Sequence, residues 1–325
     1  MIAVLDWNRY EATRRCVLSL APLRERGATI LIVDNASREP EAEQIAAELG
    51  PGHEPLTLAS NGGVAGGYTE ALRWADARGA SHVLLLNNDT VLNDTALADH
   101  LMAACGDRVA VAGPQILEED GQLNSAGAWI DWRRGRTRHV RALPSAPGVY
   151  AAEWVHGSCM MIRLDAYRAI GGFDRRFFMY WEDIDWCVRA WGAGWRCVIE
   201  PAASITHIGG LTAPSAQSAR LILRNSLFLM RKHGSSRDHA IFLAYYLVRR
   251  LPSHVLRHAW PPSQLREAFS AVTDALAWNL RQARRAGSWR LPGLRTRPHD
   301  GEAPIGIPAG AVTAPPPARR PQAVK

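Results

Sequence analysis

Short apolar runs alternate with amphipathic stretches of helical length over residues 1–115. Five runs have the length and apolar content of strands, at residues 2–5, 29–33, 56–58, 82–86 and 109–112. Between them, stretches such as residues 10–23 and 65–78 have the apolar spacing of helices. The alternation predicts an α/β fold, in which βαβ units surround a mostly parallel central sheet.

The pattern changes twice after this region. Residues 116–150 carry turn signals, and a second strand-rich run follows at residues 153–163. After about Thr212 the pattern is helical, and residues 291–325 contain eight prolines, which argues against a folded tail. We therefore expect an α/β domain over residues 1–217, a basic helical extension over 218–290 and a disordered Pro-rich tail over 291–325.

The positive charge of the chain is concentrated at its C-terminal end. The net charge is +7, yet the part from Arg220 onward carries 18 Lys and Arg against 5 Asp and Glu. We expect helices that pack partly on the α/β domain and present a Trp-containing basic face to an anionic surface, either membrane or nucleic acid. The arginines expected on this face are Arg224, Arg249, Arg250, Arg281, Arg284 and Arg285. The alternatives are a dimer interface and an ordinary solvated helical face.

Cysteine usage and hydropathy bear on the compartment. The five cysteines are scattered without a Cys-x-x-Cys pair, which favours a reducing cytosol over a disulfide framework. The N-terminus lacks the features of a signal peptide. The best apolar run, residues 240–248, is far shorter than the ~18 residues of a membrane span. We expect a cytoplasmic protein, or one bound peripherally at the inner face of the plasma membrane.

Polar residues cluster where three predicted strands end. Asp34 and Asn35 close the second strand, Asn61-Gly62-Gly63 follow the third, and Asn87-Asn88-Asp89 close the fourth. One such group could be a helix cap, but ligands bind outside the carboxyl ends of strands in open α/β sheets. The pattern predicts a crevice lined by Trp7, Asp34, Asn61 and Asp89.

The glycine-rich segment from Asn61 to Gly67 has two interpretations. It allows a phosphate or a sugar to approach the backbone at the start of a helix. It lacks the Gly-Lys-Ser/Thr of a P-loop, and it does not follow the first strand as a dinucleotide fingerprint would. A tight strand-to-helix turn remains the alternative to a binding loop.

Acidic and aromatic residues combine over residues 173–185. Glu182, Asp183 and Asp185 follow several large aromatics, and Asp174 lies upstream beside a Gly-Gly turn. Because an unpaired buried carboxylate is costly, these acids suggest a site for a hydroxylated ligand, a metal, or both. The alternative is a helix start, where acids complement the helix dipole. His207, after a short predicted strand, is either structural or a ligand of the same crevice.

Taken in order, these motifs resemble family 2 glycosyltransferases of the bacterial rhamnosyltransferase-like branch, over about residues 2–230. The matching residues are Val4-Leu5-Asp6-Trp7-Asn8, Val33-Asp34-Asn35-Ala36-Ser37, Asn61-Gly62-Gly63 with Ala65 and Gly67, Leu86-Asn87-Asn88-Asp89, Gly157-Ser158-Cys159-Met160-Met161, Gly171-Gly172-Phe173-Asp174, Phe178, Trp181-Glu182-Asp183-Ile184-Asp185, Arg189, Gly194, Pro201 and His207. The resemblance implies a GT-A nucleotide-sugar fold and a hexosyltransferase that inverts the anomeric carbon.

The resemblance also implies roles on the donor side. Trp7 and Asp34 would contact the nucleotide base, while Asn61, Gly63 and Asn88 would shape the pocket beside it. The branch often uses dTDP-L-rhamnose, so we expect this donor, with UDP- and GDP-sugars as alternatives. The partner would be a cell-envelope or lipid-linked glycan, and no nucleic acid is implied.

Further roles concern the metal and the acceptor. Asp89 would hold Mg²⁺ or Mn²⁺ on the diphosphate, with His207 as a further ligand. Asp183 would be the base that deprotonates the acceptor hydroxyl, and Trp181 and Glu182 would hold the acceptor sugar. Many relatives have an acid where this chain has Asn87-Asn88, so the metal would depend more on diphosphate oxygens and water.

Two other classes of protein stay open at this stage. A nucleotidyltransferase could use a similar sheet and a metal-binding aspartate, although residues 8–11 are not the glycine-rich basic loop expected for a triphosphate. A nucleic-acid-binding or membrane-surface protein would explain the basic end but not the acidic and aromatic segment.

Overall fold

A large mixed sheet organises the N-terminal two thirds of the molecule. The computed structural model describes residues 1–143, 148–208, 216–257 and 262–286. In this part a ten-stranded sheet has the order β10-β12-β6-β11-β4-β1-β2-β3, with β5 paired to β12 and β7 to β6. The sheet strands are β1 (Ile2–Asp6), β2 (Ile30–Asp34), β3 (His53–Thr57), β4 (His82–Asn87), β5 (Thr90–Val91), β6 (Val109–Leu117), β7 (Leu123–Ser125), β10 (Tyr150–Ala151), β11 (Cys159–Arg163) and β12 (Arg196–His207).

Helices lie on both sides of this sheet, and a separate hairpin, β8 (Ala128–Asp131) and β9 (Arg136–His139), extends from it. The helices of the α/β part are α1 (Tyr10–Ser19), α2 (Ala21–Glu25), α3 (Glu41–Leu49), α4 (Gly63–Asp76), α5 (Leu97–Ala104), α6 (Leu164–Ile170) and α7 (Glu182–Gly192). The α/β prediction is confirmed. The predicted helix over residues 10–23 is two helices, because α2 begins anew after Leu20 with Pro22 in its first turn, where proline needs no amide partner.

Strand direction changes in the middle of the sheet. The strands β3, β2, β1 and β4 are parallel to one another, and β12 is parallel to β6. Between these groups β11 runs antiparallel to both β4 and β6. Most neighbours along the main order are therefore parallel, and the carboxyl ends of β1, β2 and β4 meet at one edge.

Alternate residues of the central strands bury into two separate cores. On β1, Ala3 and Leu5 face one core while Ile2 and Val4 face the other. Because successive side chains of a strand point to opposite faces, a strand covered on both sides must be apolar throughout. This explains why the central strands appear in the sequence as continuous apolar runs.

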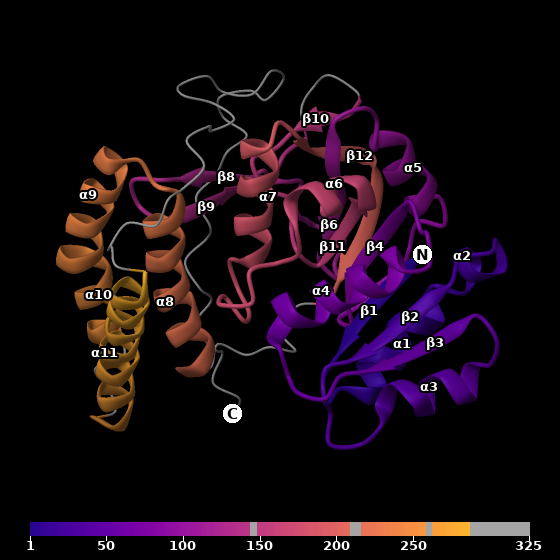
Figure 1. Cartoon of the computed structure of the whole chain (residues 1–325), viewed down its shortest axis with the longest axis horizontal. Coiled ribbons are helices and arrows are strands. Elements are labelled where there is room, and N and C mark those ends of the chain that lie inside the picture. The colour runs from indigo at the N-terminus through magenta and orange to yellow at the C-terminus, as the bar shows by residue number, and fades with distance from the viewer. Residues whose placement is uncertain (144–147, 209–215, 258–261, 287–325) are drawn as a thin grey trace.

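The C-terminal part is a group of helices packed beside the sheet domain (Figure 1). It comprises α8 (Ala216–His233), α9 (Ser236–Tyr245), the π-helix η1 (Tyr246–Arg250), α10 (Leu251–Arg257) and α11 (Pro262–Arg285). The division after residue 217 stays a prediction, and the predicted tail lies outside the described residues. In the described part of the chain, no helix is long and apolar enough to cross a membrane.

Candidate active site

Two cavities meet at the carboxyl edge of the sheet. The first, of about 430 Å³, is lined by Leu5, Asp6, Trp7, Arg9, Asn35, Asn61, Gly63, Val64, Asn87, Asn88, Asp89, Phe178, Met179, Tyr180, Gln217 and Ser218. The second, of about 520 Å³, shares Val64, Asn87, Asp89, Met179 and Tyr180 with the first. It adds Thr137, Trp154, His156, Gly157, Ser158, Trp181, Glu182, Asp183, Ile184, His207 and Ile222. A ligand in one cavity can therefore reach a ligand in the other.

The glycine loop forms part of the wall of the first cavity. Asn35 donates to the Gly63 carbonyl at 3.0 Å and accepts from the Gly62 amide at 3.0 Å. Gly63 has a left-handed backbone (φ 67°), and a Cβ there would overlap the Phe178 carbonyl oxygen. Glycine is thus required at this position by conformation and by space. The loop is both the tight turn and the cavity wall that the sequence left as alternatives.

Two buried carboxylates lie beneath the first cavity. Asp6 accepts from the Thr13 hydroxyl at 2.6 Å and from Asn88 at 3.3 Å, and Asp34 accepts from the Ser37 amide at 2.7 Å. Burial, and then a hydrogen bond with Asp6, raise the pKa of Glu41 to about 7. The Oδ2 atom of Asp34 is buried with no hydrogen-bond partner in the described structure. Such atoms are costly unless a ligand supplies a donor or a cation.

Of the two residues predicted to contact the nucleotide base, Trp7 lines the first cavity and Asp34 does not. Trp7 is 51% exposed and lines the mouth of the first cavity. Asp34 is not among the lining residues, because its side chain turns inward to cap the following backbone turn, and its neighbour Asn35 lines the cavity instead. Asp6, to which sequence reasoning gave no role, does line the cavity.

Strand pairing brings Asp89 and His207 together. β5, directly after Asp89, pairs with the end of β12, so that His207 lies opposite Thr90. The His207 Nε2 atom lies 3.1 Å from Asp89 Oδ1. Burial alone would lower the pKa of His207, but the hydrogen bond and charge of Asp89 outweigh burial and raise it.

The pair fits part of a divalent-cation site. A carboxylate oxygen and an imidazole nitrogen that lie together at a cavity are ligands that Mg²⁺ and especially Mn²⁺ accept. In the described residues no group of three or more His, Cys, Asp or Glu is placed to hold a metal ion. A cation there would need its other ligands from a bound diphosphate and from water, as the sequence predicted.

The first turn of α7 carries two acids into the second cavity. Asp183 accepts from the Gly157 amide at 3.0 Å and from the Ile184 amide at 2.8 Å. Burial raises the pKa of Asp183 to about 6, against the opposing effect of these amides and of the Trp154 indole. Burial, and then the charge of Asp183, raise the pKa of Glu182 well above its usual range. Asp183 can therefore exchange a proton near neutral pH, while Glu182 favours its protonated form.

Asp185 does not belong to this cavity, and the expectation that three close acids face a ligand is wrong in this respect. Its buried carboxylate contacts Arg189 at 2.9 Å, Lys232 at 2.6 Å and His233 at 2.7 Å. Burial opposes ionisation of Asp185, but these partners lower its pKa. Because helical residues two positions apart point to nearly opposite sides, Asp183 and Asp185 cannot share a face. Asp174 also binds Lys232, at 2.8 Å.

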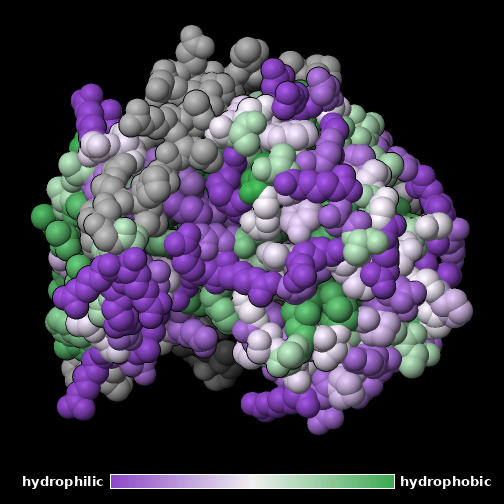
Figure 2. Space-filling view, viewed as in Figure 1, coloured by the Kyte–Doolittle hydropathy of each residue, from purple (hydrophilic) through white to green (hydrophobic). Residues whose placement is uncertain are grey.

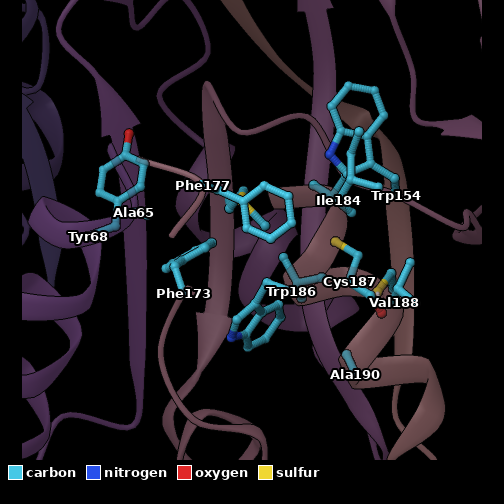
Figure 3. Close-up of a cluster of buried hydrophobic side chains, with 14 of the residues drawn as sticks. Ala65, Tyr68, Trp154, Phe173, Phe177, Ile184, Trp186, Cys187, Val188 and Ala190 are labelled. Atoms are coloured by element: carbon cyan, nitrogen blue, oxygen red, sulfur yellow. Dashed lines mark hydrogen bonds between the residues drawn. The ribbon is translucent and has the colours of Figure 1, made fainter. Parts of the chain in front are cut away.

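Aromatic side chains pack behind α7 and support it. Phe173 lies between Tyr68 and Trp186, with ring centroids 6.0 Å from each. Figure 3 shows this group beside Phe177, with Trp154 on the other side of Ile184. Phe173 and Phe177 of the acidic segment therefore form its core support, whereas Phe178, Tyr180 and Trp181 reach the cavity linings.

His156 is a cavity residue that sequence reasoning missed. Its Nδ1 atom accepts from the Ser158 amide at 3.2 Å, which leaves the ring proton on Nε2. Burial, with the nearby His139 and His207, lowers the pKa of His156 to about 3. The ring is therefore a neutral hydrogen-bond donor in the second cavity. Its position directly before Gly157-Ser158 was the available signal.

The segment between the two cavities has a strained backbone that α8 holds in place. Phe178, Tyr180 and Trp181 have positive φ values of 66°, 69° and 75°, which non-glycine residues rarely adopt. Asn225 on α8 donates to the carbonyls of Phe177, Met179 and Tyr180 at 2.7–2.9 Å. Sequence reasoning missed Asn225 because it lies far along the chain, among apolar helical residues.

Replacing Asn225 by alanine should destabilise the protein and slow the reaction at this site. The three carbonyls would lose a buried donor, so we expect a loss of about 2 kcal/mol or more in the free energy of unfolding and at least about tenfold in turnover. Urea denaturation and a steady-state assay measure both. Arg220→Ala, on the same helix but contacting Ser270 and Asp274, is the matched control and should change little. Unchanged turnover in Asn225→Ala would show that Asn225 does not position the segment between the cavities for the reaction.

Two cavities that share part of their lining, the second with the Asp183 carboxylate, give room for two ligands side by side. The chain belongs to the family described as "Glycosyl transferase family group 2", which matches residues 82–271. The protein is therefore a glycosyltransferase, and the resemblance seen in the sequence is confirmed. This match decides between that activity and the two alternatives left open.

Curated relatives point to the rhamnosyltransferase-like branch. The chain is 29% identical over 222 residues to an N-acetylglucosaminyl-diphospho-decaprenol L-rhamnosyltransferase of Mycobacterium tuberculosis, covering 59% of this chain and 70% of the relative. It is 28% identical over 171 residues to the low-salt glycan biosynthesis hexosyltransferase Agl10 of Haloferax volcanii, covering 50% of this chain and 53% of the relative. The chain thus spans about half the length of the second relative.

Solved structures share the fold. GalNAc-T7 with UDP, GalNAc and Mn²⁺ matches 90% of this chain and 57% of its own, with a TM-score of 0.60 and 15% identity. The mannosyltransferase PcManGT of Pyrobaculum calidifontis, in complex with GDP-Man and Mn²⁺, matches 88% of this chain and 79% of its own, with a TM-score of 0.52 and 15% identity. These likenesses confirm the GT-A fold.

Proposed function

We propose that this enzyme transfers L-rhamnose from dTDP-L-rhamnose to a sugar hydroxyl of a lipid-linked or cell-envelope glycan, with inversion at the anomeric carbon. The relative from Mycobacterium tuberculosis, named for L-rhamnosyl transfer to a diphospho-decaprenol, supports this choice of sugar and acceptor. We also propose that the enzyme is cytoplasmic and lies at the inner face of the plasma membrane.

The observation that carries the proposal is that the two cavities have different linings around a shared aspartate. Both are lined by Asp89, whereas Asp183 lines only the second. A donor diphosphate in the first cavity and an acceptor in the second would place the base on the acceptor side of the reacting carbon. One carboxylate suffices for a single displacement, which needs a base and forms no covalent enzyme intermediate.

The residues of the second cavity would prepare the acceptor. Asp183, held by the Gly157 and Ile184 amides, takes the proton from the attacking hydroxyl. The acceptor sugar is oriented by Trp181, by Glu182 in its protonated form and by the Nε2–H group of His156. In the first cavity the nucleotide is held by Trp7 and by the pocket residues Asn61, Gly63 and Asn88. Asp34 fixes the backbone turn at Ser37 beside this cavity.

Asp89 and His207 would hold a divalent cation, Mg²⁺ or Mn²⁺. When bound, this ion supplies Lewis-acid neutralisation of the charge that develops on the departing diphosphate. The two fold relatives solved with Mn²⁺ support this assignment.

A donor screen tests the proposed sugar. Purified enzyme with dTDP-L-rhamnose and a short-chain diphosphate-linked N-acetylglucosamine acceptor should release dTDP faster than UDP- or GDP-sugars release their nucleotides, by about tenfold or more. Nucleotide release without acceptor is the control for hydrolysis. Faster release from a UDP- or GDP-sugar would replace rhamnose in this account and leave the transfer chemistry intact.

A further inference from the structure

The helix formed by α9, η1 and α10 is apolar on its outer side. Its inner side buries His239, Phe242, Tyr246 and Leu251. Its exposed positions include Ala240, Ile241, Ala244, Leu247, Val248, Pro252 and Leu256. A surface helix of a water-soluble domain normally carries polar residues on the side away from the core. Apart from Ser236, Arg237 and Arg249, the described exposed positions of this helix are apolar.

The exposed residues on this outer side are large. Leu247 is 51% exposed, Val248 79% and Leu256 72%. Figure 2 shows hydrophobic surface along the left edge of the molecule, where Figure 1 places α9. A contiguous apolar surface rimmed by polar residues commonly marks an interaction site.

Arginines border this apolar surface. Arg237 and Arg249 are exposed on the helix itself. The β8–β9 hairpin lies alongside: Gly135 in its turn lies against Phe242, and its carbonyl accepts from Arg250 at 2.9 Å. On the same hairpin, Arg136 lies over the Tyr245 ring at 5.5 Å, and Arg133 is exposed. The helix and the hairpin therefore present one surface, apolar in the centre and cationic at its borders.

We propose that this surface, the outer side of residues 236–257 with the adjoining β8–β9 hairpin, docks on an anionic lipid bilayer. Apolar side chains enter the headgroup region while arginines meet lipid phosphates, as in interfacial amphipathic helices. A second copy of the chain fits less well, because a two-fold interface would bring arginines against arginines. Asp238, the acid beside them, already lies 3.8 Å from Arg133.

The location suits the proposed acceptor, and this part of the inference rests on the proposed function. Thr137, on β9 of the same hairpin, lines the cavity that contains Asp183. A lipid-linked glycan held in the bilayer would thus have a short path to the base. The proposal that the protein docks on a bilayer depends only on the composition of this surface. Vesicle binding tests it without an activity assay.

The docking residues differ from those expected from the sequence. Arg224 donates to the Phe177 carbonyl at 2.6 Å and lies over the Trp278 ring at 4.6 Å. Trp278 packs edge-on against Phe228, and Arg250 is directed at Gly135. Two of the arginines expected on a membrane face, Arg224 and Arg250, therefore bind carbonyl groups inside the protein.

Liposome sedimentation of the full chain tests the proposal. The wild type should sediment with vesicles of phosphatidylcholine mixed with phosphatidylglycerol at low salt, and far less with phosphatidylcholine alone. Leu247→Glu/Val248→Glu should weaken this binding by at least about tenfold. Leu18→Glu/Met102→Glu is the matched control, because it makes the same charge change at exposed apolar positions of α1 and α5, and it should bind like the wild type.

Two results would overturn the proposal. The first is a wild type that stays in the supernatant with anionic vesicles, or a Leu247→Glu/Val248→Glu variant that sediments as fully as its control. The second is a dimer in analytical ultracentrifugation that the same variant converts to a monomer, which would assign the surface to a second copy. Circular dichroism should show that both variants are folded like the wild type. Rhamnosyl transfer could fail while docking holds, so the two proposals fail separately.

Discussion

The Asp183→Asn variant is expected to lose transfer activity by ~10²-fold or more while it binds nucleotide diphosphate like the wild type. The amide keeps the shape of the side chain but cannot accept the proton of the acceptor hydroxyl. The first cavity, where the nucleotide is proposed to bind, does not include Asp183. Steady-state transfer and calorimetric nucleotide binding measure the two effects separately. Asp120→Asn, in an exposed turn, is the control and should be fully active.

The pH profile of the same reaction gives an independent check. Burial raises the pKa of Asp183 to about 6, and the residue acts as a base only when ionised. We therefore expect kcat/KM to fall as the pH drops through about 6, and the residual activity of Asp183→Asn to lack this limb. If the variant keeps more than about a tenth of wild-type turnover, the base must be assigned elsewhere.

The Asp89→Ala variant is expected to lose the dependence of donor binding on divalent cations. Asp89 lines both cavities and lies 3.1 Å from His207, so its removal takes away the charged ligand of the proposed ion. Transfer should fall by about 10²-fold or more, because the departing diphosphate loses its charge neutralisation. Calorimetric titration of dTDP with and without Mn²⁺ measures binding apart from turnover.

Chelation of the metal should reproduce in the wild type the loss of transfer expected for Asp89→Ala. EDTA is expected to abolish transfer, and added Mn²⁺ or Mg²⁺ should restore it in the wild type but not in Asp89→Ala. His207→Ala should weaken the cation response less, because a carboxylate and diphosphate oxygens remain. Full wild-type activity in EDTA would refute the metal assignment and leave His207 as a structural partner of Asp89.

Local patterns in the sequence predicted the central strands and part of the site, but not the short strands β5 and β7 to β9. Continuous apolar runs predicted β1, β2 and β4, because strands covered on both faces must be apolar throughout. The polar residues after β3 and β4 predicted Asn61 and Asp89 at one crevice, since carboxyl ends of parallel strands meet at one edge. Asp183 and His207 were predicted to join them, and the second cavity contains both.

Only the tertiary structure decided which acid faces the ligand and what holds it there. Asp185 has the same local sequence setting as Asp183, yet Lys232 and His233 from α8 bind it on the other side of α7. The hydrogen bond from Asn225 to the Phe177 carbonyl joins residues 48 positions apart. Short-range periodicity encodes strands and helices because their contacts are local, whereas such partners depend on how α8 packs, which no local pattern specifies.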